Sequence, residues 1–277
     1  MARGDSGDDG SFGRRVGPRS RPTRRTLLAG GLLWGIGVSG LARAAADPVI
    51  AAAASFRPAL DEIVAAFAQE TGGKVRISYG ATGALVRQIE LGAPFELILA
   101  ADAESVARLV AGGHTDGPGR ELVRGRIVLA VRRGAPLDVG RGLSGLGAAL
   151  DGGRIRRFAI ANPELAPYGR AAREALTRAG LWPRLDGRLA VAENIGQAAQ
   201  FVASGAAEAG VVALSSVRAP ELRATLAWSE IPEGEHAPIT QHMAVLARAG
   251  KVSRAFAGFL DAPASLQVFE RAGFAVR

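Results

Sequence analysis

The order of hydrophobic and polar residues after position 46 alternates between two periods. Short apolar runs, such as Val49–Ala54 and Phe95–Ala100, are typical of buried strands. The stretch after the first run instead places Leu60, Ile63 and Phe67 at helical spacing. Repeated strand–loop–helix units predict an α/β fold, in which mostly parallel sheets carry helices on both faces.

The same periodicity predicts the other elements of the chain. Further strands are expected at 75–79, 126–131, 158–161, 189–192 and 210–214, with extended segments near 224–231 and 240–247. Further helices are expected after the turn at 80–83 and at 103–111, 170–180, 195–204, 251–260 and 263–272. We expect Ser55 to cap the first helix and residues 162–169 to form a loop.

Four strand-to-helix junctions of this pattern are candidates for a binding site. In open sheets of parallel strands, ligands bind at the carboxyl ends of the strands. The start of a helix presents free backbone N–H groups there, and converging helix starts bind anions without any positive side chain. The four junctions are Ala54-Ser55, Thr82-Gly83, Tyr168-Gly169 and Asn194-Ile195.

Composition and charge exclude several classes of site. The chain has no cysteine, which excludes disulfides, thiolate metal sites, a cysteine nucleophile and a lipid-modified cysteine. Its three histidines lack metal-ligand spacing, so no directly coordinated metal is expected. Residues 1–46 carry +5 of the net charge of +8, and the basic residues of the remainder are scattered. With aromatic residues at 5%, this pattern does not favour nucleic-acid binding.

The N-terminal segment predicts export. Arg24-Arg25 forms a twin-arginine pattern before a Gly-rich apolar run, and small residues follow at 42–46. We expect a signal peptide cleaved after Ala44 or Ala46, which would leave a soluble periplasmic protein. The run is too short for a good membrane span, which disfavours an uncleaved anchor. Export by the general secretory route stays open.

Enzymatic motifs are absent from the body of the sequence. It contains no GxSxG, HExxH or Walker loop. Paired acids such as Asp61-Glu62 lie on an expected helix and are interpreted as a solvated face. The sequence therefore predicts a binding protein without a cofactor rather than an enzyme.

Several segments, in order over about residues 48–277, carry a family resemblance. They are 52–56 (AAASF), 79–89 (YGATGALVRQI), 92–102, 161–172 (ANPELAPYGRAA), 193–198, 210–215 and 263–274. Together they resemble the periplasmic molybdate-binding proteins of ABC importers. The resemblance implies a two-lobed clamshell of the periplasmic-binding-protein type (type II), with an oxyanion in the cleft. It also implies a membrane permease as partner and a monomer.

The resemblance implies a ligand set residue by residue. Hydroxyl ligands fall on Ser55 and Thr82, the residue before the loop glycine on Tyr168, and a backbone N–H donor on Ile195. A tyrosine that contacts the anion in some relatives is replaced by Ala213 here. Where the family often has Gln-Asp in a late crossover strand, this chain has Gln241-His242.

The implied domain plan has four parts. Residues 1–46 are a disordered N-terminus and signal peptide, 47–128 the first lobe, 129–232 the second lobe, and 233–277 the return to the first lobe. Crossings between the lobes are expected near 126–132 and 226–237.

Each implied ligand has a simpler interpretation. Ser55 and Thr82 could be plain helix caps, Tyr168 a turn residue, and Ile195 a buried residue at a helix start. As ligands, they suit a fully ionised tetrahedral dianion, which only accepts hydrogen bonds. No Asp or Glu occupies the four junctions, which disfavours a protonated phosphate. Molybdate is expected, tungstate as well, and another tetrahedral oxyanion such as sulfate is the alternative.

Overall fold

The computed structural model describes residues 46–135 and 137–276. The predicted signal peptide, with Arg24-Arg25 and the expected cleavage positions, therefore lies outside the described residues except at Ala46. In the described part, no helix is both long and apolar enough to cross a membrane.

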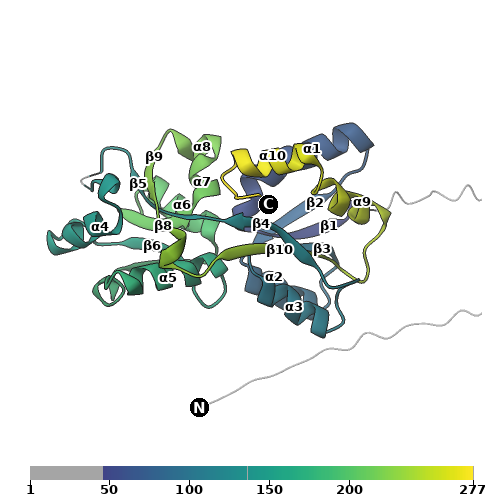
Figure 1. Cartoon of the computed structure of the whole chain (residues 1–277), viewed down its shortest axis with the longest axis horizontal. Coiled ribbons are helices and arrows are strands. Elements are labelled where there is room, and N and C mark those ends of the chain that lie inside the picture. The colour runs from purple at the N-terminus through teal and green to yellow at the C-terminus, as the bar shows by residue number, and fades with distance from the viewer. Residues whose placement is uncertain (1–45, 136, 277) are drawn as a thin grey trace, which may run out of the picture. The chain divides into compact units, whose positions relative to one another are not determined.

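Two five-stranded sheets form the framework, one in each half of the folded unit (Figure 1). The first sheet has the order β2-β1-β3-β10-β4, and β1 runs parallel to both β2 and β3. Its strands are β1 (Val49–Ala53), β2 (Arg76–Gly80), β3 (Phe95–Ala100), β4 (Arg120–Gly125) and β10 (Ile239–Val245). Strand β10 is antiparallel to β3 and β4.

The second sheet repeats this plan. Its order is β7-β6-β8-β5-β9, with β6 parallel to β7 and β8, and β5 antiparallel to β8 and β9. The strands are β5 (Ile127–Arg132), β6 (Phe158–Ala161), β7 (Leu189–Ala192), β8 (Ala209–Ala213) and β9 (Leu226–Glu230). Two mixed sheets with helices on both faces confirm the predicted fold class.

The alternation of side chains along β1 explains how helices cover both faces of the first sheet. Ile50 and Ala52 belong to the core under α1, whereas Ala51 belongs to the separate core under α2 and α3. Helices α1 (Arg57–Thr71), α9 (Lys251–Phe259) and α10 (Pro263–Arg271) lie on one side, and α2 (Thr82–Glu90) and α3 (Ala103–Ala111) on the other (Figure 1). Because apolar residues occupy every position of β1, both faces of the first sheet are shielded from water at this strand.

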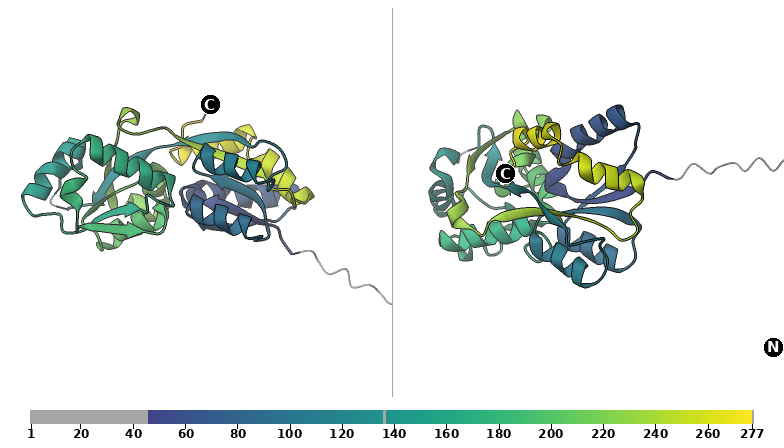
Figure 2. Two further views of the ribbon diagram at one scale, coloured as in Figure 1. Left: turned by 90° about the horizontal axis from the view of Figure 1, so that it is seen from below. Right: turned by 45° about the vertical axis from the view of Figure 1, so that its right-hand side comes forward.

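The second sheet carries α4 (Gly142–Asp151), α5 (Pro167–Arg178), α6 (Ile195–Ser204), α7 (Leu214–Arg218) and α8 (Pro220–Arg223). The chain passes from the first sheet to the second at Arg126, which separates β4 from β5, and returns between β9 and β10. Figure 2 shows these connections spanning the two halves. We call the half built on the first sheet the first lobe and the other the second lobe. The predicted boundary at 128/129 falls inside β5, and the boundary at 232/233 falls in the return segment.

Some predicted elements differ from those observed. Strand β4 was not expected, because its sequence RELVRG alternates weakly and carries charges. Helix α4 was missed because its sequence, GLSGLGAALD, is rich in glycine, which disfavours helices. Burial of Leu146, Ala149 and Leu150 overrides that propensity. The helix expected at 170–180 begins earlier, at Pro167, whose fixed φ suits a first helical position.

Candidate functional site

Pairing within each sheet brings the four junctions together in two pairs. In the first lobe, Ala53 lies beside Gly80 at the ends of the parallel strands β1 and β2, so the short 3-10 helix η1 (Ala54–Phe56) and α2 both start at the carboxyl end of this sheet. In the second lobe, Ala161 lies beside Ala192 at the ends of β6 and β7. The carboxyl ends of parallel strands therefore place two helix starts of each lobe at one edge, as the sequence predicts.

Contacts across the boundary between the lobes, where the resemblance predicts the cleft, then join the two pairs. The Gly83 N–H donates to the Leu165 carbonyl at 2.9 Å. A Cβ placed on Gly196 would lie 3.6 Å from the Ala54 Cβ, so the start of α6 packs against η1. The Ser215 Oγ, in α7, donates to the Ser55 carbonyl at 2.8 Å. The junctions thus face one another across the boundary between the lobes.

Ser55 does not cap a helix, and that expectation is wrong. The N-cap residue of α1 is Phe56, and no side chain caps either α1 or η1. The Ser55 side chain is fully buried, and its Oγ instead donates to the Gln241 Oε1 at 3.2 Å. The tertiary fold therefore aims this hydroxyl away from its own backbone and into the boundary between the lobes.

Thr82 is the first residue of α2, and it is not a side-chain cap either. The N-cap position is Ala81, and the Thr82 Oγ1 accepts a hydrogen bond from the Ala101 N–H at 3.0 Å. Since that bond uses a lone pair of the hydroxyl oxygen, the hydroxyl proton stays available as a donor. Only 1% of Thr82 is exposed, so any partner of that proton lies inside the protein or in its cleft.

Tyr168 is the second residue of α5 rather than part of a preceding loop. Its hydroxyl reaches the first lobe, where the Tyr168 Oη accepts from the Gln241 Nε2 at 2.8 Å. Burial raises the pKa of Tyr168 above its ordinary value, although hydrogen bonds with Ser55 and Gln241 act in the opposite direction. The phenol therefore keeps its proton at physiological pH.

Ile195 opens α6, and its side chain is buried. The preceding residue, Asn194, is the N-cap, and its Oδ1 accepts from the Gln197 N–H at 3.0 Å. The Gln197 Oε1 in turn accepts from the Glu193 N–H at 2.6 Å. These bonds fix the helix start and leave the N–H groups of Ile195 and Gly196 without an acceptor inside the helix.

Gln241 contacts two of the candidate site residues, a role that the sequence alone does not indicate. It lies in β10, is fully buried, and touches both Ser55 and Tyr168. The sequence does indicate that Gln241 is buried, since Ile239, Gln241 and Met243 alternate as the inward residues of one strand. A polar residue at such a position needs partners, but only the fold shows which they are.

One ion pair crosses between the lobes beside these junctions. The Arg170 guanidinium, in α5, contacts the Asp102 carboxylate at 2.6 Å, and Asp102 also caps α3 by accepting from the Ser105 N–H. Asp102 therefore has its oxygens engaged by donors of the protein. No carboxylate at the four junctions is left as an acceptor for a protonated ligand.

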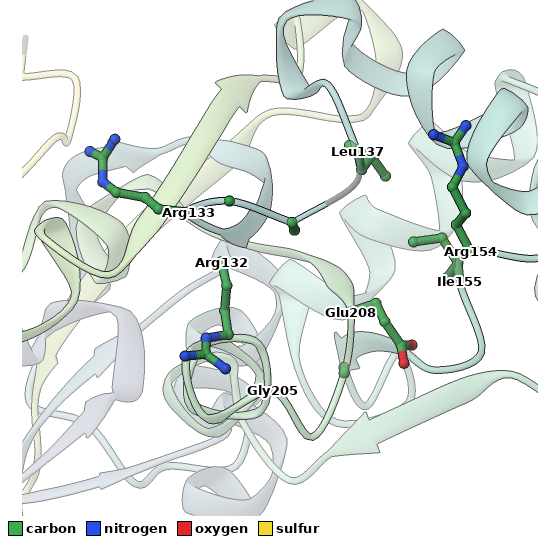
Figure 3. A pocket seen from close by; sticks show the side chains of 10 residues that line it. Arg132, Arg133, Leu137, Arg154, Ile155, Gly205 and Glu208 are labelled. Atoms are coloured by element: carbon green, nitrogen blue, oxygen red, sulfur yellow. The ribbon is translucent and has the colours of Figure 1, made fainter.

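A cavity of about 400 Å³ lies at the opposite edge of the second sheet, and we call it the distal cavity. Its lining includes Arg132, Arg133, Arg154 and Glu208. It lies at the end of β5 that pairs with the start of β8, away from the carboxyl ends that carry the junctions. Figure 3 shows the three arginine side chains pointing in different directions.

Comparisons with known proteins agree with this arrangement. Residues 48–275 match the family model described as bacterial extracellular solute-binding protein. Molybdate-binding protein ModA of Azotobacter vinelandii is 34% identical over 248 residues, which cover 88% of this chain and 95% of the relative. ModA of Rhodobacter capsulatus is 36% identical over 257 residues, which cover 90% and 97%.

Solved structures of binding proteins have a similar fold. The periplasmic molybdate-binding protein of Azotobacter vinelandii superimposes with a TM-score of 0.75 at 29% identity, over 83% of this chain and 100% of that one. The sulfate-binding protein SubI of Mycobacterium tuberculosis matches with a TM-score of 0.68 over 82% of this chain and 86% of that one, but at 18% identity it shows the fold alone. The chain therefore belongs to the bacterial extracellular solute-binding proteins, in the family of the molybdate-binding proteins ModA.

Proposed function

We propose that this protein captures molybdate, and also tungstate, outside the cytoplasm and delivers it to the membrane permease of an ABC importer. The observation that carries the proposal is the set of buried neutral donors at the four junctions. Ser55 and Thr82 offer hydroxyls, and the starts of α5 and α6 offer backbone N–H groups at Tyr168 and Ile195. In this proposal these four residues hold the anion.

The chemistry of the donors supports a fully ionised ligand. A tetrahedral dianion has only acceptor oxygens, and every group proposed to face it can donate. Helix starts add positive potential without a mobile cation. Molybdate and tungstate have this charge and shape, and the family membership favours them over sulfate. A protonated phosphate would need an acceptor, and Asp102 is already engaged by Ser105 and Arg170.

Titration calorimetry of the chain from residue 47 onward, with molybdate, tungstate, sulfate and phosphate, tests the proposal. We expect molybdate and tungstate to bind at least a hundredfold more tightly than sulfate, and phosphate to give no heat of binding. Equal affinity for sulfate would favour the alternative oxyanion. No binding of any of the four would contradict the proposal.

Delivery to the cell envelope is the second part of the proposal. The pattern Thr23-Arg24-Arg25-Thr26 favours twin-arginine export, followed by cleavage near Ala44 or Ala46. Replacing Arg24-Arg25 by two lysines keeps the charge of the segment. We expect the mature form to vanish from the periplasmic fraction on an immunoblot. Normal processing of that variant would assign export to the general secretory route.

A further inference from the structure

Gln241 occupies the point where the two lobes and the proposed anion site meet. It belongs to β10 of the first lobe, where it pairs with Val123 in β4. Its amide contacts one hydroxyl from each lobe, Ser55 of the first and Tyr168 of the second. Both hydroxyls belong to residues proposed above to bind the oxyanion.

The amide sets the direction of both hydrogen bonds. A glutamine oxygen can only accept and its nitrogen can only donate. The Gln241 Oε1 accepts from the Ser55 Oγ at 3.2 Å, and the Gln241 Nε2 donates to the Tyr168 Oη at 2.8 Å. Because the Tyr168 oxygen is an acceptor in this bond, its proton must point to a different partner. The Ser55 hydroxyl has a single proton, so that proton must leave this long bond to Gln241 before it can donate to the anion.

Packing at the crossing between the lobes reinforces this arrangement. A Cβ placed on Gly125 would lie 2.1 Å from the Tyr168 Oη and 2.8 Å from the Gln241 Nε2. Gly125 is the last residue of β4 and precedes Arg126, where the chain enters the second lobe. The tyrosine hydroxyl and the glutamine amide therefore both pack against the end of β4. A side chain at position 125 would separate them.

Burying a primary amide in a strand core is unfavourable unless both of its ends are hydrogen-bonded. The Gln241 side chain has a partner at each end only while Tyr168 of the second lobe lies against the first lobe. Movement of the second lobe away from β10 would leave the Nε2 without this acceptor. The bond therefore stabilises the arrangement in which the four junctions face one another.

We propose that Gln241 is a positioning residue for the oxyanion site. It holds Tyr168 of the second lobe, whose backbone N–H is proposed to bind the anion, close to Ser55 of the first lobe, and so ties the positions of both residues to closure of the lobes. The inference rests on the proposed function, since it concerns the same ligand. It adds a residue that holds two proposed ligands in place and acts on the anion through them.

A double-mutant cycle on molybdate affinity tests this role. Gln241→Met keeps the length of the side chain and removes both hydrogen bonds. We expect it to weaken molybdate binding by at least about tenfold, as loss of a buried hydrogen bond to a polar group does. In a Tyr168→Phe background the hydroxyl partner is already gone, so the same substitution should weaken binding by only about twofold more.

A stability control separates positioning from general destabilisation. Ser265→Ala removes another buried hydroxyl bond, from the Ser265 Oγ to the Phe259 carbonyl at 2.7 Å, in the α9–α10 region. We expect a lower melting temperature with molybdate affinity unchanged. If Gln241→Met does not fold, Gln241→Asn is measured instead. It keeps a neutral amide but shortens its reach to the Tyr168 hydroxyl, so molybdate affinity should again fall.

The outcomes distinguish this inference from the proposed function. If the parent protein does not bind molybdate, the proposed function fails. If the parent binds and a folded Gln241 variant binds within twofold of it, the positioning role is overturned. Full additivity of Gln241→Met and Tyr168→Phe would overturn it as well, because independent structural losses add whereas a shared hydrogen bond does not.

Discussion

The cleft between the lobes and the distal cavity differ in the way they present positive charge. The cleft residues proposed to bind the anion, Ser55, Thr82, Tyr168 and Ile195, are all uncharged and buried. The distal cavity has three arginines in its lining, yet these guanidinium groups do not converge (Figure 3). Arg133 donates to the Ala224 carbonyl, and Arg154 to the Ala148 carbonyl.

Fixed neutral donors are expected to suit a dianion better than mobile cations do. Hydroxyls and helix starts are held by the fold before the ligand arrives, so little entropy is lost on binding. The carbonyl bonds of Arg133 and Arg154 hold these guanidinium groups in orientations that do not converge on one point. Glu208, which also lines the distal cavity, would repel an anion there. Local geometry rather than the number of basic residues therefore favours the cleft.

The largest expected effect comes from removing the cleft hydroxyls. Ser55→Ala and Thr82→Ala should each weaken molybdate binding roughly tenfold to a hundredfold, because a charge-assisted hydrogen bond contributes about 1.5–3 kcal/mol. Thr82→Ala also removes the acceptor of the Ala101 N–H, so its melting temperature should fall as well. Calorimetry and thermal melting measure the two effects separately.

Thr82→Ser is the matched control for this prediction. It keeps the hydroxyl and the acceptor for Ala101, and it should bind molybdate nearly as well as the parent. Unchanged affinity in both alanine variants would mean that neither hydroxyl faces the anion.

A smaller effect is expected from the ion pair that crosses between the lobes. Arg170→Met removes the contact with Asp102, and 37% of the arginine side chain is exposed. Exposed pairs contribute about 1 kcal/mol or less, so affinity should fall about twofold to fivefold at low salt. Added salt should reduce the difference from the parent.

Arg173→Met provides the control on the same helix. Its partner, Glu164, lies in the same lobe, so that ion pair is unaffected by closure. We expect no change in affinity for this variant. Equal effects of the two substitutions would argue against a role for Arg170 in closure.

The smallest effect on molybdate binding is expected from a substitution in the distal cavity, Glu208→Gln. Burial raises the pKa of Glu208, but the N–H groups of Arg157 and Arg156 outweigh it and hold this pKa below its usual value. A lowered carboxyl pKa contributes stability above the unfolded pKa, and this stability is lost as the pH falls through the folded pKa. Glu208→Gln should therefore lower the melting temperature at pH 7, because the amide lacks the negative charge that the Arg156 and Arg157 N–H groups stabilise.

That difference should shrink in acid, once the parent carboxyl is protonated too. Molybdate affinity should stay within twofold of the parent, because the cavity lies at the other edge of the sheet. A large loss of affinity on this substitution would place a ligand in the distal cavity.

The junctions of the cleft could be predicted from sequence because they depend on local order. A strand followed by a helix start at Ser55, Thr82 or Ile195 can be recognised within about ten residues. The family resemblance then assigned ligand roles to these positions. The side-chain partners of Ser55 and Thr82 lie 186 and 19 positions away, so local sequence alone could not identify them, and the expected cap at Ser55 was wrong.

Gln241 shows most clearly what could not be predicted from the sequence alone. Its partners are 186 and 73 positions away, and they belong to different lobes. The hydrophobic pattern identifies it only as a polar residue on the buried side of a strand. Similarly, α4 forms although its glycines disfavour a helix, because burial in the second lobe outweighs local propensity.

Crystals of the protein with molybdate, measured at the molybdenum absorption edge, test the central claim most directly. The anomalous signal marks the metal atom of the anion without any assumption about the site. We predict a single strong peak in the cleft, with the surrounding oxygens within hydrogen-bond distance of Ser55, Thr82, Tyr168 and Ile195. A peak beside Arg132 and Arg154 in the distal cavity, with none in the cleft, would contradict the account.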